Sequence, residues 1–354
     1  MFASLNGSIN RPDLRWALQA LPKVDLHRHL EGSLRLETLA GIAREHGVDL
    51  PSYNLDELRP YVQVTADYQP GFHSFLEKFN LLRRFYQTRQ AIERIAYEAV
   101  ADAACDNIKY LELRFNPVAL ARVQGFGYGD VMDWVWEAVQ HAQDDHDIIA
   151  RLIVSITRQE PGTAKTVLDA TLDHMDRGIV ALDLSGDEVN FPLAPFIPVF
   201  HRAREAGLGL IVHAGEAGGA ENVREAIELI HPQRIGHGVR CVENFDVARL
   251  VRQQGVTLEL CPTSNLQTGA VYMMSYHPLL DLYRLGLKVT INTDDPSVSD
   301  TTLTDEYCLA MMGTGLQIAD LKVMIMTAVQ ASFLPPREKA ALDARFRAAL
   351  SFGI

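Results

Sequence analysis

Residues 24–42, VDLHRHLEGSLRLETLAGI, contain the pattern that decides the fold. The stretch begins with an apolar, β-rich run, Val24 to His29. It continues with apolar residues at helical spacing, namely Leu34, Leu36, Leu39 and Ile42. Side chains alternate between faces in a strand and return to one face every three to four residues in a helix. The stretch therefore predicts a strand followed by a helix.

The same unit recurs along the chain. The eight predicted strands are 24–29, 109–116, 150–157, 178–184, 208–214, 234–238, 257–261 and 288–293. Segments with helical periodicity separate most of them, such as AIERIAYEAVADAAC, VMDWVWEAVQHAQ, AKTVLDATLDHM, ENVREAIELI and DVARLVRQQG. Alternating strands and helices predict an α/β fold with a parallel sheet. Eight units, without a glycine-rich dinucleotide motif after the first strand, favour a closed (β/α)8 TIM barrel over an open doubly wound sheet.

The chain shows no internal repeat, charge block or flexible linker, so residues 1–354 are expected to form a single domain. The stretch from about Asn54 to Thr88 is longer than a simple connection requires. Because it follows the first strand, it predicts extra helices over the C-terminal mouth of the barrel.

Composition excludes several classes of protein. The 354 residues carry 33 Lys and Arg against 45 Asp and Glu, a net charge of −12, and 47% are hydrophobic. Such a globular chain would be repelled by nucleic-acid phosphates and anionic lipids, so we expect neither nucleic acid nor membrane as a partner. Four scattered cysteines without a CxxC pair indicate no disulfide framework, and the first twenty residues lack the apolar core of a secretory signal. A cytoplasmic protein is expected.

Polar residues follow the apolar runs where the mouth of a barrel would lie. They are His27 and His29 in the first strand, His213 and Glu216 after the fifth, His237 in the sixth, and Asp294 and Asp295 after the eighth. Residues at the carboxyl ends of barrel strands converge on the active site. Imidazole and carboxylate ligands without thiolate suit zinc or a similar divalent ion, which can activate water for hydrolysis. Since residues 181–186 offer no lysine to bridge two metals, we predict one Zn²⁺ per chain, bound by three histidines and one carboxylate of the eighth strand.

Each signal alone has a structural explanation. An HxH pair is often two unrelated histidines, His237 between glycines could belong to a tight turn, and Asp294-Asp295 before Pro296 could begin a helix. The metal site is favoured because these independent explanations would have to coincide at the same ends of four strands.

At these residues the sequence resembles the adenosine/adenine deaminase family, a metal-dependent branch of the amidohydrolase superfamily. The resemblance covers essentially the whole chain and is greatest to bacterial adenosine deaminases. It rests on HRHLEGSL at 27–34, FLEKF at 75–79, LDLSGDE at 182–188, HAGE at 213–216, GHG at 236–238, CPTSNLQTG at 261–269 and NTDDP at 292–296.

The resemblance assigns roles to individual residues. It implies that zinc is bound by His27, His29, His213 and Asp294. Glu216 matches the family's proton shuttle, which protonates purine N1 as hydroxide adds to C6 and later helps ammonia leave. His237 and Asp295 match residues that orient the attacking water. The implied substrate contacts are His29, Glu31, Phe75, Gly186 and Asp295, with the Gly186 N–H near purine N3 and Phe75 and Leu76 in a mobile gate.

The resemblance also implies a zinc-dependent hydrolase that converts adenosine or 2′-deoxyadenosine to inosine or 2′-deoxyinosine and ammonia. Glu31 stands where adenosine-specific members commonly have Asp near the ribose 5′-hydroxyl. Adenine and 5′-modified adenosines such as 6-aminodeoxyfutalosine are therefore alternative substrates. A phosphate-binding barrel enzyme is a less favoured alternative, because the sequence contains no glycine-rich phosphate-binding loop. The alternative of a different class is a non-catalytic purine-binding relative.

Two further residues are expected to be structural. Glu112 and Arg114 share one face of the second predicted strand, and we expect them to form an ion pair inside the barrel rather than to act in catalysis.

Overall fold

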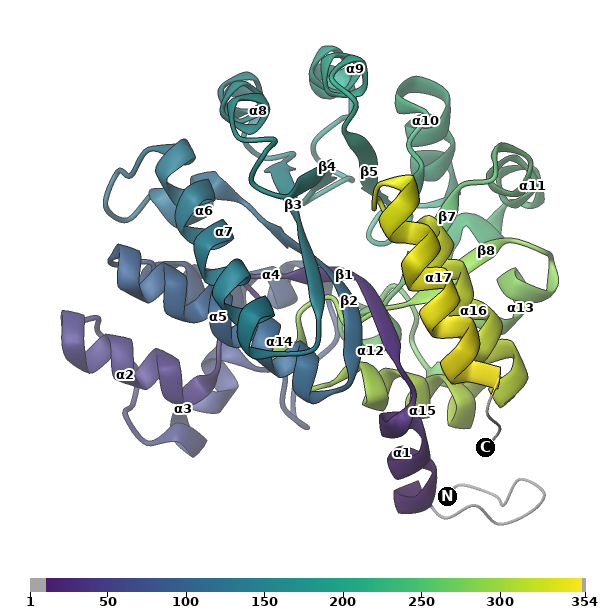
Figure 1. Cartoon of the computed structure of the whole chain (residues 1–354), viewed down its shortest axis with the longest axis horizontal. Helices are drawn as coiled ribbons and strands as arrows, with labels where there is room; N and C mark the ends of the chain where they lie inside the picture. Colours follow the sequence, from purple (N-terminus) through teal and green to yellow (C-terminus); the bar gives the residue numbers. More distant parts are fainter. Residues whose placement is uncertain (1–10, 352–354) are drawn as a thin grey trace.

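The computed structural model describes residues 11–351, which form a barrel of eight parallel strands that follow one another in chain order (Figure 1). The strands are β1 (Lys23–His29), β2 (Ile108–Phe115), β3 (Ile149–Thr157), β4 (Ile179–Ser185), β5 (Gly209–Ala214), β6 (Arg234–His237), β7 (Thr257–Leu260) and β8 (Lys288–Ile291). The segment after β8 closes the barrel onto β1. The Asp294 N–H donates to the His27 carbonyl and the His29 N–H donates to the Asp294 carbonyl, each at 2.8 Å.

The predicted fold is confirmed. Every predicted strand is present, with ends within two residues of the expected ones. The accuracy has a physical cause, since buried parallel strands form continuous apolar runs that glycines and polar residues terminate sharply. Residues 1–10, which include half of the stretch used to argue against a secretory signal, lie outside the described residues, as do 352–354.

Helices surround the barrel and cover its mouth. The longer helices that follow or cross between strands are α5 (Arg89–Cys105), α7 (Tyr128–Asp145), α8 (Ala164–Asp173), α9 (Ile197–Glu205), α10 (Ala220–Ile230), α11 (Phe245–Gln254) and α16 (Ile318–Ala331). The others are α1 (Arg11–Ala20), α2 (Leu36–His46), α3 (Leu55–Val62), α4 (Phe72–Leu82), α6 (Pro117–Ala121), α12 (Pro262–Gln267), α13 (Leu279–Arg284), α14 (Pro296–Ser299), α15 (Leu303–Thr314) and α17 (Pro336–Ser351). Among residues 11–351, none of these is both long and apolar enough to cross a lipid bilayer.

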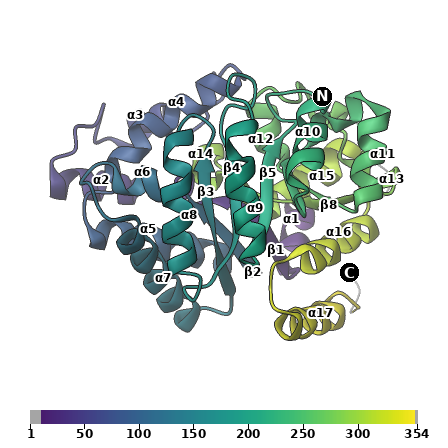
Figure 2. The same ribbon diagram turned by 90° about the horizontal axis from the view of Figure 1, so that it is seen from above.

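The long connection after β1 forms extra helices, as predicted. Asn54 caps α3 by accepting hydrogen bonds from the backbone N–H groups of Asp56 and Glu57, and Thr88 caps α5 in the same way through the Ala91 N–H. In Figure 2, α3 and α4 lie on one side of the molecule, and α16 and α17 lie on the opposite side. Residues of α4 line the pocket at the mouth of the barrel.

The predicted ion pair between Glu112 and Arg114 is wrong. Arg114 lies 2.8 Å from Glu259 Oε2 on β7, and Glu112 pairs with Arg234 on β6. The cause is the shape of the barrel. Residues i and i+2 of one strand stand about 6.6 Å apart along it and point inward side by side, so a partner across the narrow interior is closer.

Glu306 on α15 gives the folded protein a pH-dependent stability. Its buried carboxylate accepts hydrogen bonds from the Thr263 N–H at 2.9 Å and the Thr301 hydroxyl at 2.7 Å. Burial nevertheless raises the pKa of Glu306 from 4.5 to about 7. The folded state therefore binds more protons than the unfolded chain between these values, and the free energy of unfolding falls as the pH rises through this window.

We expect Glu306→Gln to remove this dependence, because the amide imitates the protonated acid. The contribution is complete below pH 4.5 and lost above about pH 7, and it is worth at most about 3 kcal/mol. Denaturant unfolding at pH 4.5 and pH 8 measures it. The loss of stability between the two pH values should be smaller in Glu306→Gln than in the parent and unchanged in the exposed control Glu45→Gln. Equal losses in all three proteins contradict the expectation.

Candidate metal and catalytic site

The mouth of the barrel brings together the polar residues predicted from the strand ends. His27 and His29 end β1, His213 lies in β5, His237 ends β6, and Asp294 follows β8. The backbones of His237 and Asp294 are left-handed, with φ of 60° and 63°. Residues other than glycine rarely adopt this conformation, and such strain is concentrated at functional sites. Here it turns both side chains at the point where their strands end.

Four side chains form a compact group of potential metal ligands. His27, His213, His237 and Asp294 each offer one donor atom, and these atoms lie within 4.8 Å of one another. His29 is adjacent, because its Nε2 lies 3.3 Å from Asp294 Oδ1, the oxygen that is also 3.1 Å from His27 Nε2. All four predicted ligands therefore meet, and His237 lies close enough to compete with His29.

Carboxylates outside this group orient two of the histidines. Glu259 Oε2 lies 2.8 Å from His27 Nδ1, and Asp183 Oδ1 lies 3.0 Å from His213 Nδ1. A carboxylate acceptor fixes the proton on Nδ1 and leaves a lone pair on Nε2, which is how metal-binding histidines are held. His27 Nε2 is buried, and within residues 11–351 it makes no hydrogen bond of acceptable geometry, although Asp294 Oδ1 lies 3.1 Å away. The donor set therefore fits a divalent metal ion.

Glu216 is held at the edge of this group by its backbone. Glu188 accepts hydrogen bonds from the N–H groups of Gly215, Glu216 and Gly218 at 2.8 to 2.9 Å, which fixes the turn after β5. The Glu216 carboxylate lies 3.5 Å from His237 Nε2. Burial, together with the charges of Asp294 and Glu188, raises the pKa of Glu216 well above its ordinary value. Glu216 is thus suited to hold a proton and to transfer it to a neighbouring group.

Asp295 points into the site rather than capping a helix. It precedes α14, but its side chain makes no capping hydrogen bond, which removes the structural explanation of the Asp-Asp pair. Its Oδ1 is buried and has no hydrogen-bond partner among the described residues. Burial and the neighbouring carboxylates of Asp294 and Glu31 raise its pKa well above the ordinary value. A substrate or water group could satisfy the unpartnered oxygen.

Gly32 makes room for Asp295. A Cβ atom at Gly32 would lie 1.9 Å from Asp295 Oδ1, far inside van der Waals contact. We expect Gly32→Ala to displace this carboxylate by about 1 Å and to lower kcat by about 100-fold. Steady-state kinetics measures the effect. Gly41→Ala is the matched control, because its Cβ would come no closer than 3.7 Å to Arg94, and equal activity of the two variants would contradict the expectation.

A pocket of about 380 Å³ opens above these groups and is lined in part by α4. The remaining predicted substrate contacts, Glu31, Phe75 and Gly186, all line it. Glu31 Oε1 accepts a hydrogen bond from the Asn116 N–H at 2.7 Å, and burial raises the pKa of Glu31 to about 7. Gly186 has φ of 98°, and a Cβ there would lie 2.1 Å from Gln159 Oε1. Close backbone approach to a ligand is therefore possible at Gly186.

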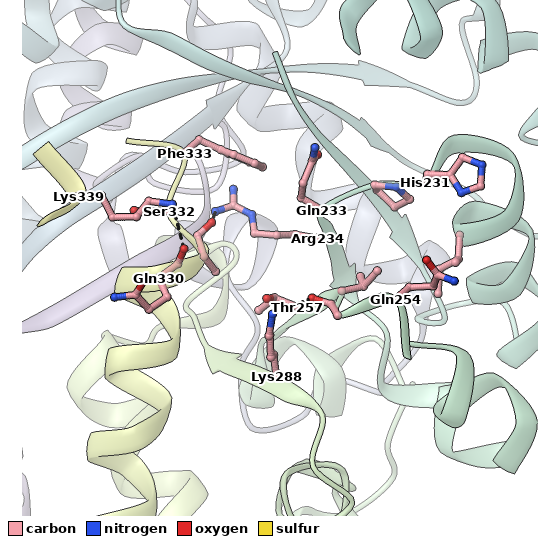
Figure 3. Close-up of a pocket in the computed structure, with 15 residues that line it drawn as sticks. His231, Gln233, Arg234, Gln254, Thr257, Lys288, Gln330, Ser332, Phe333 and Lys339 are labelled. Carbon is pink, nitrogen blue, oxygen red and sulfur yellow. Dashed lines mark hydrogen bonds between the residues drawn. The ribbon is translucent and has the colours of Figure 1, made fainter. Parts of the chain in front are cut away.

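A second pocket, of about 420 Å³, lies at the opposite end of the barrel (Figure 3). It is lined by Arg234, Thr257 and Lys288, the first residues of β6, β7 and β8. None of the predicted site residues contributes to it. Since active sites of these barrels lie at the carboxyl ends of the strands, the pocket beside the histidines is the candidate active site.

Comparison with known proteins agrees with this geometry. The adenosine deaminase family model matches residues 22–348. The chain belongs to this family. It is 40% identical to an adenosine deaminase of Clostridium botulinum (strain Kyoto / Type A2), over 91% of this chain and 96% of that protein.

Solved structures of family relatives share the architecture. Adenine deaminase from Arthrobacter aurescens is 28% identical with a TM-score of 0.86, covering 94% of this chain and 99% of that one. An amidohydrolase from Burkholderia ambifaria with bound zinc is 27% identical with a TM-score of 0.87, covering 99% of this chain and 97% of that one. The predicted family is therefore confirmed, and a metal-dependent hydrolase is the activity typical of its members.

Sequence reasoning missed several residues that hold the site of this deaminase family member. They are Gly32, Asp183, Glu188, Glu259 and Asn265. Gly32, Asp183, Glu188 and Asn265 lie within the motifs that carry the resemblance, but no role had been inferred for them. Glu259 could have been noticed as the one charged residue in the apolar run of β7, TLEL, where an unpaired charge would be costly.

Proposed function

We propose that this chain catalyses the hydrolytic deamination of adenosine and 2′-deoxyadenosine, giving inosine or 2′-deoxyinosine and ammonia. One observation carries the proposal: Glu216, an acid with a raised pKa, lines the same pocket as three members of the potential ligand group, His213, His237 and Asp294. The 40% identity to an adenosine deaminase over nearly the whole chain supports this substrate class.

One zinc ion per chain is the proposed cofactor, held by His27, His29, His213 and Asp294. The absence of thiolate from the donor set and the zinc-bound relative support this choice. When bound, zinc would supply Lewis acidity that makes water a nucleophile near neutral pH.

The protein's own groups would perform the proton transfers and the positioning. Glu216 would donate its proton to purine N1, accept a proton from the attacking water, and pass that proton to the amino group, which leaves as ammonia. It would then take up the proton of the C6 hydroxyl as the carbonyl forms, which restores its starting state. His237 and Asp295 would orient the water toward C6, since His237 Nε2 lies 3.5 Å from Glu216. Gly186 would present its N–H to N3, and Phe75, 3% exposed, would pack against the base together with Leu76.

The group on purine N9 decides between the proposed substrate and its alternatives. Glu31, with a pKa of about 7 and one buried oxygen that no other group in residues 11–351 hydrogen-bonds, is the proposed contact of the ribose. Adenine, the substrate class named for the Arthrobacter relative, would leave this carboxyl without a sugar partner.

An ultraviolet assay of the purified, zinc-loaded protein tests the proposal. Adenosine, 2′-deoxyadenosine, adenine and 6-aminodeoxyfutalosine are compared by kcat/KM, and released ammonia is quantified. We expect the two nucleosides to be preferred and a chelator to abolish turnover. Preference for adenine or for the 5′-modified nucleoside would replace the substrate assignment, and purine binding without ammonia release would overturn the enzymatic one.

A further inference from the structure

A line of three hydrogen bonds connects His237 to the segment between β7 and β8. The Leu279 N–H donates to His277 Nδ1 at 3.1 Å, His277 Nε2 lies 3.2 Å from Asn265 Oδ1, and Asn265 Nδ2 lies 3.0 Å from His237 Nδ1. Asn265 lies in α12, and Leu279, at the far end of the line, is the first residue of α13. His237, Asn265 and His277 are at least 96% buried, so water does not compete for these contacts.

The direction of every bond in this line follows from its last member. A backbone N–H can only donate, so His277 Nδ1 must carry a lone pair and the proton of the neutral ring must be on Nε2. That Nε2–H requires an acceptor, which fixes the Asn265 oxygen toward His277 and its NH₂ group toward His237. The Asn265 NH₂ group donates to His237 Nδ1. The remaining proton of neutral His237 is therefore on Nε2.

In this assignment the ring proton of His237 is on the other nitrogen from that of the neighbouring histidines. His27 and His213 present Nδ1 to carboxylates, which places their protons on Nδ1 and their lone pairs at Nε2, toward the site. His237 instead presents an Nε2–H to the site, where carboxylate oxygens of Glu216 and Asp294 lie at 3.5 Å and 3.8 Å. A nitrogen that carries a proton cannot ligate a metal ion.

We propose that Asn265 and His277 are positioning residues that fix the proton of His237 on Nε2, so that His237 donates a hydrogen bond in the active site and stays outside the metal ligand set. The catalytic consequence rests on the proposed function, whereas the tautomer does not. The inference explains why a histidine within 4.8 Å of three potential ligands leaves the fourth position to His29.

Three variants separate this role from simple packing. Asn265→Asp keeps the shape but accepts only, so it should draw the His237 proton to Nδ1. His277→Phe fills the space without a donor, and His277→Gln restores a donor toward Asn265. The exposed His201→Gln is the control for the loss of a histidine. The ¹⁵N chemical shifts of the histidine rings in labelled, zinc-loaded protein report the tautomer of His237, and kcat and KM are measured beside them.

We expect Nε2-protonated His237 in the parent protein and Nδ1-protonated His237 in Asn265→Asp. Reversal of a catalytic tautomer costs up to about 10⁴-fold in kcat, and loss of an outer partner costs about 10- to 100-fold. The expected kcat order is therefore parent and His277→Gln, then His277→Phe, then Asn265→Asp, with KM little changed.

The measurement on the parent protein needs no variant to fold, and Nδ1-protonated His237 there overturns the proposal. Equal thermal destabilisation of His277→Phe and His277→Gln without a difference in kcat would also overturn it, because that result describes packing alone. A parent with the expected tautomer but no deaminase activity would support the assignment of the proton and contradict the proposed function.

Discussion

We expect Glu216→Gln to lower kcat by about 10²- to 10⁴-fold, the usual contribution of a general acid or base, and to leave the metal content unchanged. The amide keeps the size of the side chain but can neither deliver a proton to purine N1 nor take one from water. Glu216 does not belong to the compact group of potential ligands, so its replacement should not release the metal. Removing the carboxylate beside His237 should also leave the fold intact, because the turn is held by Glu188 through backbone N–H groups.

Elemental analysis and steady-state kinetics on the same preparation check this expectation. Glu221→Gln is the matched control, since Glu221 lies in the first turn of α10, five residues after Glu216, and its side chain is 66% exposed. Near-normal turnover in a metal-replete Glu216→Gln protein would reject the proton-transfer role. Lost metal together with lost turnover would instead place Glu216 among the ligands.

The strands could be predicted because their signal is local. Most are short runs rich in apolar residues that end near a glycine or a polar residue, and the order of strands in the sheet follows the chain. Once that order is known, the strand ends meet by geometry alone. This is why His27, His213 and Asp294 could be assigned to one site although 267 residues separate the first from the last (294 − 27).

The contacts that hold the site could not be predicted, because they depend on which side chains meet across the interior of the barrel. Arg114 reaches Glu259 across the interior instead of Glu112 beside it, and no sequence spacing encodes that choice. Gly32 matters through a 1.9 Å approach to Asp295, which only coordinates reveal. The line from Leu279 to His237 likewise joins residues whose relation depends on the path of the irregular segment between β7 and β8.

Five residues compete for four metal-ligand positions, and this competition leads to the second large effect. Distances favour His237, which is in the compact group, over His29, whose Nε2 is 3.3 Å from Asp294. Tautomers favour His29, because the proton on His237 Nε2 blocks its lone pair. We expect His29→Ala to weaken zinc binding by more than about 100-fold, which is the largest effect typical of residues that only hydrogen-bond to a metal ligand. His237→Ala should keep one zinc per chain and lose turnover.

Competition with a chelator of known zinc affinity distinguishes the two histidines without reference to activity. The decisive quantity is the zinc dissociation constant of His29→Ala divided by that of His237→Ala. Both variants remove one imidazole from the mouth of the barrel, so any general loss of stability is common to both. A ratio well above one assigns the fourth position to His29 and leaves His237 as a donor to the reacting water. A ratio below one would mean that the side chains rearrange when metal binds, so that proximity decides the ligand set and the proton on His237 is displaced by the ion.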